Sequence, residues 1–493
     1  MPSHASYPQL DGPLFEMVQQ EGVFPDSKTL VDCVPATDPD VIDDRFRRGD
    51  FDLERFVRNH FVLPEDPVTG GDPTTVSMEW YIDELWDHLI RDPVQTRAGE
   101  TILELPHRSV IPGGRFREIY YWDSYFAAEG LAVTGRFDLI AELAANFASL
   151  IERFGFVPNG GRIYYTSRSN PPLFHRVLDL LAHRRGPEAV VEHLPALERE
   201  YDFWMDGAAE VGAGDAHRRV VGVEGGVLNR YWDDDPSPRV ESYREDVELA
   251  AVADREPEEL YRDVRAACES GWDFSSRWFA GGGMETIRTT GLVPVDLNAF
   301  LYGMEYSLAG WHERAGDADR AEEYRERAME RRALVDRYCW DAEAGFYFDH
   351  AWAEGEQSDA WTLAAAVPLF TGMASAEQAA EVAEILEDRF LRPGGLVTTL
   401  TESGEQWDAP NGWAPLQWMA VVGLAGYGHE ELATRIAGRW LDLNRAVFDR
   451  TGQMLEKYDV TGGTGEGLGG EYPLQYGFGW TNGVALALPR LFY

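Results

Sequence analysis

From about residue 120 onward, apolar positions recur three and four residues apart, with short Gly, Pro and Asp punctuation between the runs. This spacing is typical of amphipathic helices. The sequence predicts helices over residues 122–134, 137–154, 171–185, 187–206, 242–254, 257–270, 295–315, 318–339, 359–371, 376–390, 412–427, 430–449 and 481–491. Residues 1–100 show poor periodicity and many Pro and Asp, so we expect them to form an N-terminal extension.

The predicted helices alternate between two kinds. Residues 413–424 are mostly small, apolar or aromatic, whereas residues 318–329 are amphipathic and strongly charged. Buried helices next to half-exposed ones are what two concentric helical rings require. The sequence therefore predicts an all-α fold, an (α/α)6 barrel made of six helical hairpins over residues 101–493. With residues 1–100 packed on the barrel, it forms one structural domain. A stack of helical repeats is the alternative, but the pairs share no sequence period.

The amino-acid composition limits the classes of molecule that this protein is expected to bind. The net charge of −41 disfavours nucleic acid and anionic membranes, which need clustered Lys and Arg. Lysine is almost absent, since Lys28 and Lys457 are the only two among 44 basic residues. Such Arg-biased, acidic usage resembles proteins of halophiles, whose acidic surface preserves solubility in concentrated salt. An acidic cytosolic protein with an Arg-biased genome is the alternative.

Cysteine usage and the N-terminus bear on the compartment. Cys33, Cys268 and Cys339 are odd in number and far apart, which predicts neither a disulfide framework nor a zinc cluster. The N-terminus lacks the basic and apolar regions of a signal peptide, and no apolar run reaches the ~20 residues of a membrane span. We therefore expect a cytoplasmic, soluble protein that acts as a monomer. No P-loop, HExxH or G-x-S-x-G motif is present.

Three segments carry the groups that bind sugars. Residues 112–125, 406–418 and 471–480 each combine aromatic rings with polar and charged side chains. Aromatic faces cover the apolar C–H faces of a pyranose, while Arg and carboxylate groups bond to its hydroxyls. Rings such as Tyr120 and Trp413 are candidates for a stacking platform, although core packing is an equal alternative for each. Three such segments predict one site assembled by one domain.

Asp273 is the candidate general acid. It follows Gly271 and lies between Trp272 and Phe274. A carboxyl packed between rings loses hydration, so its pKa rises toward the range that a general acid needs near neutral pH. The competing interpretation is that Asp273 caps a helix that begins at Phe274.

Glu456 is the candidate general base. It lies in an apolar stretch beside Lys457, one of the two retained lysines, and an ordinary salt bridge is the alternative. Two carboxyl groups flanking a glycosidic bond are the minimum needed for glycoside hydrolysis. The Gly-rich residues 462–470 contain GxGxxG, but no helix is expected after them, which argues against a dinucleotide site. We expect a flexible lid there, with a disordered surface loop as the alternative.

Residues 112–123 and 406–415 resemble the two signature motifs of the trehalases of glycoside hydrolase family 37, and the resemblance runs across nearly the whole chain. It implies an (α/α)6 barrel that hydrolyses α,α-trehalose to two glucoses with inversion, without a metal or organic cofactor. Two positions depart from the family pattern. Asn170 replaces a Gln, which shortens one hydrogen-bonding arm, and Val240 replaces a Pro between Arg239 and Glu241.

By resemblance, Asp273 is the general acid and Glu456 the general base, with carboxyls ~6.5–9.5 Å apart to admit a water molecule. The sugar contacts implied are Arg115, Phe116, Tyr120, Trp122, Asp123, Asn159, Arg168, Ser169, Asn170, Arg239, Glu241, Gly271, Trp407 and Glu471. Two other functions stay open: another α/α-barrel glycosidase acting on a related α-glucoside, and a trehalose-binding protein without catalysis.

Overall fold

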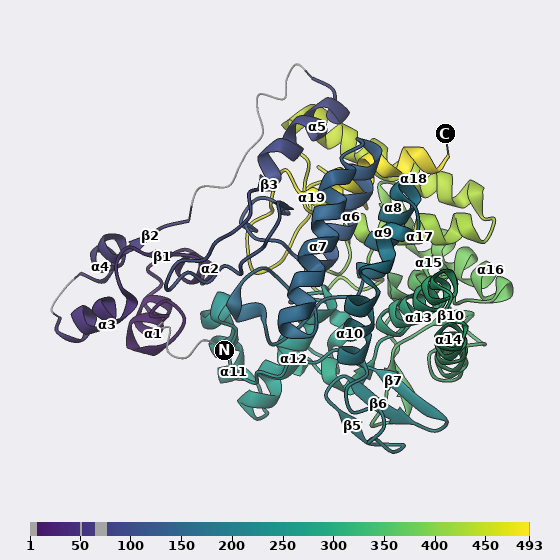
Figure 1. The fold of residues 1–493 in the computed structure, drawn as a ribbon, viewed down its shortest axis with the longest axis horizontal. Helices are drawn as coiled ribbons and strands as arrows, with labels where there is room; N and C mark the ends of the chain where they lie inside the picture. The colour runs from purple at the N-terminus through teal and green to yellow at the C-terminus, as the bar shows by residue number, and fades with distance from the viewer. Residues whose placement is uncertain (1–6, 50–51, 65–75, 493) are drawn as a thin grey trace.

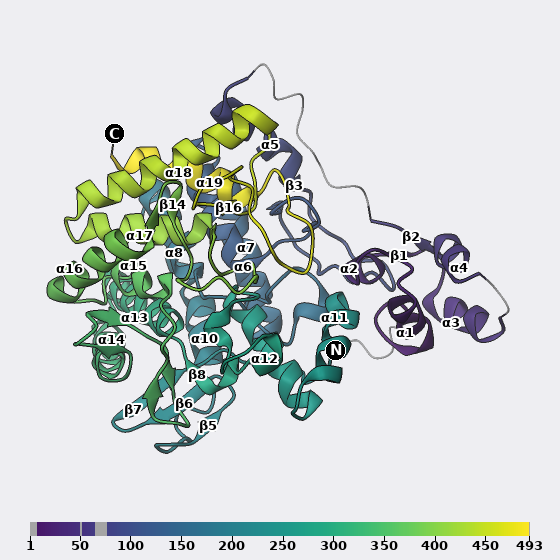
Figure 2. The ribbon, with the colours of Figure 1, turned by 180° about the vertical axis from the view of Figure 1, so that it is seen from behind.

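The computed structural model describes residues 7–49, 52–64 and 76–492. A large helical body carries a small N-terminal lobe at one side (Figure 1). Figure 2 shows the same arrangement from behind, with the C-terminal helices α18 and α19 next to α5 at the top of the body. Within the described ranges, no helix combines the length and the apolar character that crossing a membrane requires.

Six helices form a closed inner ring, since each contacts the next and the last contacts the first. They are α6 (Tyr121–Val133), α8 (Phe174–Arg185), α13 (Val295–Ala315), α15 (Val367–Phe370), α17 (Ala414–Gly426) and α19 (Gly479–Ala487). Every residue of α19 is buried, and burial extends around most of α6 and α17. Because α6, α17 and α19 have protein on almost all sides, small, apolar and aromatic residues occupy most of their positions.

The outer helices are amphipathic and bury one face. They are α5 (Met78–Leu89), α7 (Phe137–Phe154), α10 (Leu194–Trp204), α14 (Ala318–Tyr338), α16 (Ala376–Ile385) and α18 (Glu430–Thr451). In the body, α7 packs on α6 and α8, α14 on α13, and α18 on α17. Salt bridges such as Arg325–Glu322 lie on the exposed face of α14. The predicted all-α fold with an inner and an outer ring of helices is confirmed.

Most predicted helices have the expected bounds, but three differ for local reasons. The helix expected over 187–206 is divided into α9 (Glu188–Val191) and α10, because Pro195 lacks the N–H that a continuous helix needs. The helix expected from residue 359 begins only with the 3-10 turn at Leu363, just ahead of Pro368 in α15. The helix expected to reach residue 390 ends at Ile385, and a π turn follows.

Two further helices and many short strands lie in the segments that connect the barrel helices. The helices are α11 (Tyr243–Val252) and α12 (Pro257–Ser270). One antiparallel sheet has the order β5 (Ala216–His217), β6 (Val220–Val223), β7 (Gly226–Asn229). The remaining antiparallel strands of the body are β3 (Ile90–Arg91) with β4 (Ser109–Val110), β8 (Leu292–Val293) with β11 (His350–Ala351) and β12 (Glu356–Gln357), β9 (Trp340–Asp341) with β10 (Phe346–Tyr347), β13 (Leu391–Arg392) with β14 (Gly395–Leu396), and β15 (Asn411–Gly412) with β16 (Tyr458–Asp459). Strands of two to four residues are too short to show an alternation of apolar and polar positions in the sequence.

The N-terminal lobe has a small core of its own. It contains α1 (Gly12–Gln20), α2 (Lys28–Val31), α3 (Pro39–Arg47), α4 (Leu53–His60) and the pair β1 (Val34–Pro35) and β2 (Phe61–Val62). Tyr164, Val240 and Tyr243 of the body pack against this core. Helix α5, which precedes the predicted boundary at residue 100, packs in the main core against α18 and α19.

Candidate active site

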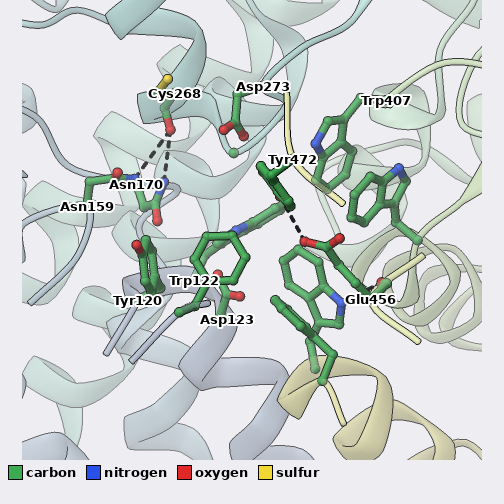
Figure 3. A pocket seen from close by; sticks show the side chains of 15 residues that line it. Tyr120, Trp122, Asp123, Asn159, Asn170, Cys268, Asp273, Trp407, Glu456 and Tyr472 are labelled. Atoms are coloured by element: carbon green, nitrogen blue, oxygen red, sulfur yellow. Dashed lines mark hydrogen bonds between the residues drawn. The ribbon is translucent and has the colours of Figure 1, made fainter. Parts of the chain in front are cut away.

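A pocket of about 470 Å³ lies at the end of the barrel where α6, α17 and α19 begin (Figure 3). The residues that line it are Phe116, Tyr120, Trp122, Asp123, Asn159, Asn170, Cys268, Gly271, Asp273, Trp407, Trp413, Glu456, Tyr472, Phe478 and Trp480. They come from all three segments that the sequence singled out, from the end of α12 and the turn after it, and from the loops that carry Asn159, Asn170 and Glu456. Distant parts of the chain thus meet at one site.

Asp273 reaches the pocket because α12 ends sharply at Gly271. That residue has φ +77, and a Cβ there would lie 2.6 Å from the indole of Trp122, so only glycine fits. Asp273 caps no helix, since the next helical turn, Ser276–Trp278, is capped by Ser275. Burial raises the pKa of Asp273 to about 7, and the Arg239 guanidinium opposes that rise.

Glu456 enters the same pocket from the opposite side, next to Tyr472 (Figure 3). Its backbone N–H donates to the Gln475 carbonyl at 3.1 Å, and its own carbonyl accepts from Nε1 of Trp480 at 2.9 Å. The Tyr472 hydroxyl donates to Oε1 at 2.8 Å. Among the described residues, Oε2 accepts no hydrogen bond, and Lys457 Nζ lies 3.8 Å away.

The charge balance at Glu456 is set by its burial and its neighbours. Burial raises the pKa of this carboxyl, while Lys457, the Tyr472 hydroxyl and then Arg115 oppose the rise. Burial also raises the pKa of Asp123 well above its ordinary value, and the nearby carboxyls Glu456 and Asp273 raise it further. Three acidic side chains therefore share one aromatic-lined pocket.

Stacked indoles form one wall of the pocket. The rings of Trp407 and Trp413 are nearly parallel with centroids 3.9 Å apart, and Trp272 also stacks on Trp407, with centroids 5.5 Å apart. Trp122 lies 5.8 Å from Trp407, and Trp480 meets Trp413 edge-on at 5.6 Å. This arrangement gives a rigid apolar surface with few polar atoms.

The structure brings together ten of the predicted site residues on the pocket wall and places six just outside it. Those outside are Arg115, Arg168, Ser169, Arg239, Glu241 and Glu471. Most of them pair with one another or with nearby groups. Arg168 is bound to Glu241 at 2.8 Å, and Arg239 bridges Asp246 at 2.6 Å and Glu471 at 2.8 Å.

The two remaining residues outside the wall have local partners. Arg115 lies over the ring of Tyr472 at 4.6 Å, and Ser169 Oγ donates to the Val157 carbonyl at 2.7 Å. At the pocket itself, the amides of Asn159 and Asn170 both donate to the Cys268 carbonyl at 3.3 Å (Figure 3). The shorter arm of Asn170 is thus held by the end of α12.

Sequence reasoning missed several lining residues. Tyr472, Phe478 and Trp480 lie in the third aromatic segment, but only Glu471 was chosen there because a sequence does not show which rings face inward. Trp413 was considered only as a platform candidate. Cys268 gave no signal, and it is a buried free thiol, as are the other two cysteines.

Comparison with known proteins identifies the family of the chain. The profile of the Trehalase family matches residues 22–492. Neutral trehalase Nth1 from Saccharomyces cerevisiae superposes with a TM-score of 0.64 and 28% identity, covering 78% of this chain and 74% of that one. The mannosylglycerate hydrolase of family GH63 from Thermus thermophilus, in complex with glucose, gives a TM-score of 0.55 at 20% identity, covering 84% of this chain and all of that one. With nearly its whole length matched, the chain belongs to the trehalase family of glycoside hydrolases.

Proposed function

We propose that the protein hydrolyses α,α-trehalose to two glucose molecules with inversion at one anomeric centre. The observation that carries this proposal is that Asp273 and Glu456 line one pocket with an aromatic wall. Membership of the trehalase family supports the substrate, and the yeast structural relative is itself described as a neutral trehalase. No metal or organic cofactor enters the proposed reaction.

Asp273 acts as the general acid. With a pKa raised to about 7 by burial, its carboxyl keeps its proton at mildly acidic and neutral pH. It donates this proton to the oxygen that bridges the two glucose units, so that the leaving sugar departs as a neutral alcohol. Arg239 holds the pKa from rising further, which keeps the proton transferable.

Glu456 acts as the general base. Its Oε2 accepts no hydrogen bond from the described residues, so this atom is available to a water molecule. The carboxylate removes a proton from that water as it attacks the anomeric carbon from the face opposite the leaving oxygen. Tyr472 and Lys457 favour the ionised form that a base requires.

The pocket walls suit a disaccharide. The indoles of Trp122, Trp407 and Trp413 give the pocket an apolar wall against which the apolar sides of pyranose rings can pack. Asp123 and the amides of Asn159 and Asn170 offer hydrogen-bonding groups to hydroxyls. The ion-paired arginines Arg168 and Arg239 stand behind this wall and hold its loops in place.

The test is glucose release from a panel of α-linked disaccharides, in high salt, by the wild type and by Asp273→Asn and Glu456→Gln. We expect turnover of trehalose alone, and losses of at least about 10³-fold in both variants with binding retained. Preferred turnover of another α-glucoside would identify a different glycosidase. Trehalose binding without turnover would identify a binding protein.

A further inference from the structure

Lys457 lies next to Glu456 and is fully buried, in a chain that holds only two lysines. Its Nζ donates to Oε1 of Gln406 at 2.6 Å and to the Gly469 carbonyl at 3.0 Å. The same nitrogen lies 3.8 Å from Oε2 of Glu456. One ammonium group thus has three partners, each on a different segment.

Gln406 extends these contacts to the acid. Its Nε2 donates to the carbonyl of Asp273, while its Oε1 accepts from Lys457. The backbone carbonyl of Gln406 is fixed in turn by Nε1 of Trp413 at 3.0 Å and by Nδ2 of Asn411 at 2.9 Å. A continuous set of hydrogen bonds therefore joins the backbone that carries Asp273 to the ammonium beside Glu456.

The Gly-rich stretch closes directly over this ammonium. Asn411 holds Leu468 through two hydrogen bonds, to its carbonyl at 2.7 Å and from its N–H at 2.9 Å. A Cβ at Gly467 would lie 2.5 Å from Cγ of Lys457, and a Cβ at Gly470 would lie 2.5 Å from Oε1 of Gln406. The glycines are required here because the loop backbone packs against Lys457 and Gln406.

The other charges around the pair are known. Glu456 and Lys457 face the carboxyl groups of Asp273 and Asp123, and on the other side Arg115 and the phenol of Tyr472 face Glu456. The Asp123 carboxyl disfavours the simultaneous ionisation of Glu456, and Lys457 is the cation nearest to Glu456 among these groups. Arg115 also favours the ionised form of Glu456, so the two cations act in the same direction.

We propose that Lys457 is a positioning residue for the hydrolysis: it keeps Glu456 ionised and, through Gln406, fixes the segment that carries Asp273, with the docked loop 467–470 completing its hydrogen bonds. This inference rests on the proposed function. It also explains the retained lysine, since a compact ammonium with three donors matches the three partners of Nζ. Docking of loop 467–470 and ionisation of Glu456 are therefore coupled.

The test compares Lys457→Met with Lys28→Met, the matched control. Lys28 is the other buried lysine, paired at 2.7 Å with both Asp32 and Glu118 in the N-terminal lobe and its junction. For Lys457→Met we expect the acid limb of the pH profile of kcat/KM on trehalose to move up by about one pH unit, with kcat reduced about tenfold or more. Lys457→Arg keeps the charge and returns the limb toward its wild-type position. In Lys28→Met we expect the acid limb of kcat/KM to be unchanged.

A second measurement needs no substrate. The side-chain carboxyls of ¹³C-labelled glutamates are titrated by NMR, with Glu456 assigned by its loss in Glu456→Gln. Its pKa should rise by about one unit in Lys457→Met and remain unchanged in Lys28→Met. An unchanged Glu456 pKa and acid limb in Lys457→Met overturn the inference even if the wild type hydrolyses trehalose. A wild type that releases no glucose removes the proposed function and leaves this titration to decide on Lys457.

If Lys457→Met does not fold, Gly470→Ala takes its place, because the added methyl displaces Gln406 and the loop from the ammonium. Gly462→Ala is its control: it also has positive φ, but its Cβ meets nothing within 4 Å. We expect kcat to fall severalfold more in Gly470→Ala than in Gly462→Ala. Equal effects would contradict the coupling between loop and base.

Discussion

The hydroxyl of Tyr472 donates a 2.8 Å hydrogen bond to Oε1 of Glu456, while the other carboxylate oxygen is left for the pocket. A hydrogen bond to the charged form of a carboxyl lowers its pKa. The pair therefore fixes the orientation of the proposed base and favours its ionised state at once. Both effects depend on one oxygen atom of a residue that sequence reasoning did not choose.

Replacement of this tyrosine tests the relationship. In Tyr472→Phe the pKa of Glu456 should rise. Glu456 then becomes protonated at a higher pH than in the wild type, so the acid limb of kcat/KM moves up by about half to one pH unit. We also expect kcat to fall about tenfold. Tyr120→Phe is the control, because that phenol lines the same pocket but donates to Glu118. A limb that moves equally in both variants would contradict the assignment.

Gly271 tests how closely α12 must approach Trp122. Gly271→Ala combines positive φ with a Cβ 2.6 Å from the indole, so we expect a loss of about 2–4 kcal/mol in stability and a clear loss of activity. Gly372→Ala has nearly the same φ, +76, but its Cβ meets nothing within 4 Å. Thermal unfolding should therefore show a smaller loss of about 1 kcal/mol there. Equal losses would mean that the contact with Trp122 is unimportant.

Asp273→Asn should change stability in a pH-dependent way. A carboxyl whose pKa is raised in the folded state stabilises the fold below its unfolded pKa, and this contribution is lost as the pH rises through about 7. Removal of the charge should thus raise the free energy of unfolding above pH 7, by up to about 4 kcal/mol, and have little effect at pH 4. Thermal melts at both pH values measure the change.

Asp408→Asn is the control. Its buried carboxylate accepts from Ser275 and Thr399, so that variant should be destabilised at both pH values.

The salt dependence of stability follows from the charge. With a net charge of −41, repulsion between acidic groups destabilises the compact state in dilute buffer. We expect the melting temperature to rise steadily between 0.1 and about 3 M KCl, since the Debye length falls from ~10 Å to a few Å by 1 M. Differential scanning calorimetry measures this directly. Equal melting temperatures across the series would contradict the halophilic interpretation.

Much of the barrel is predictable from the sequence because helix pattern and helix ends agree. Helix α13 has the predicted bounds, and Gly316 with φ +85 ends it where the pattern stops. The N-terminal helices were missed, because α2 has only four residues and α1 and α3 have nine each, with prolines in the first turn. Short elements of this kind are defined by tertiary contacts more than by periodicity.

The site was predictable in part. Asp273 and Glu456 were selected by their apolar surroundings, and the structure places both on one pocket, while their catalytic roles stay predictions. Trp480 and Tyr472 were not selected, because the direction of a ring depends on how α19 and the preceding loop pack. Arg168 and Arg239 were expected to contact sugar, yet their strongest partners are the acids Glu241 and Asp246, which only the fold brings to them.

The most direct test of the central claim is ¹H NMR of the first glucose formed from α,α-trehalose, recorded before mutarotation. Attack of water activated by Glu456, with the proton supplied by Asp273, inverts one anomeric centre and leaves the other untouched. The account predicts α- and β-glucose in equal initial amounts. Release of α-glucose alone would mean retention at the cleaved centre and would contradict the proposed mechanism.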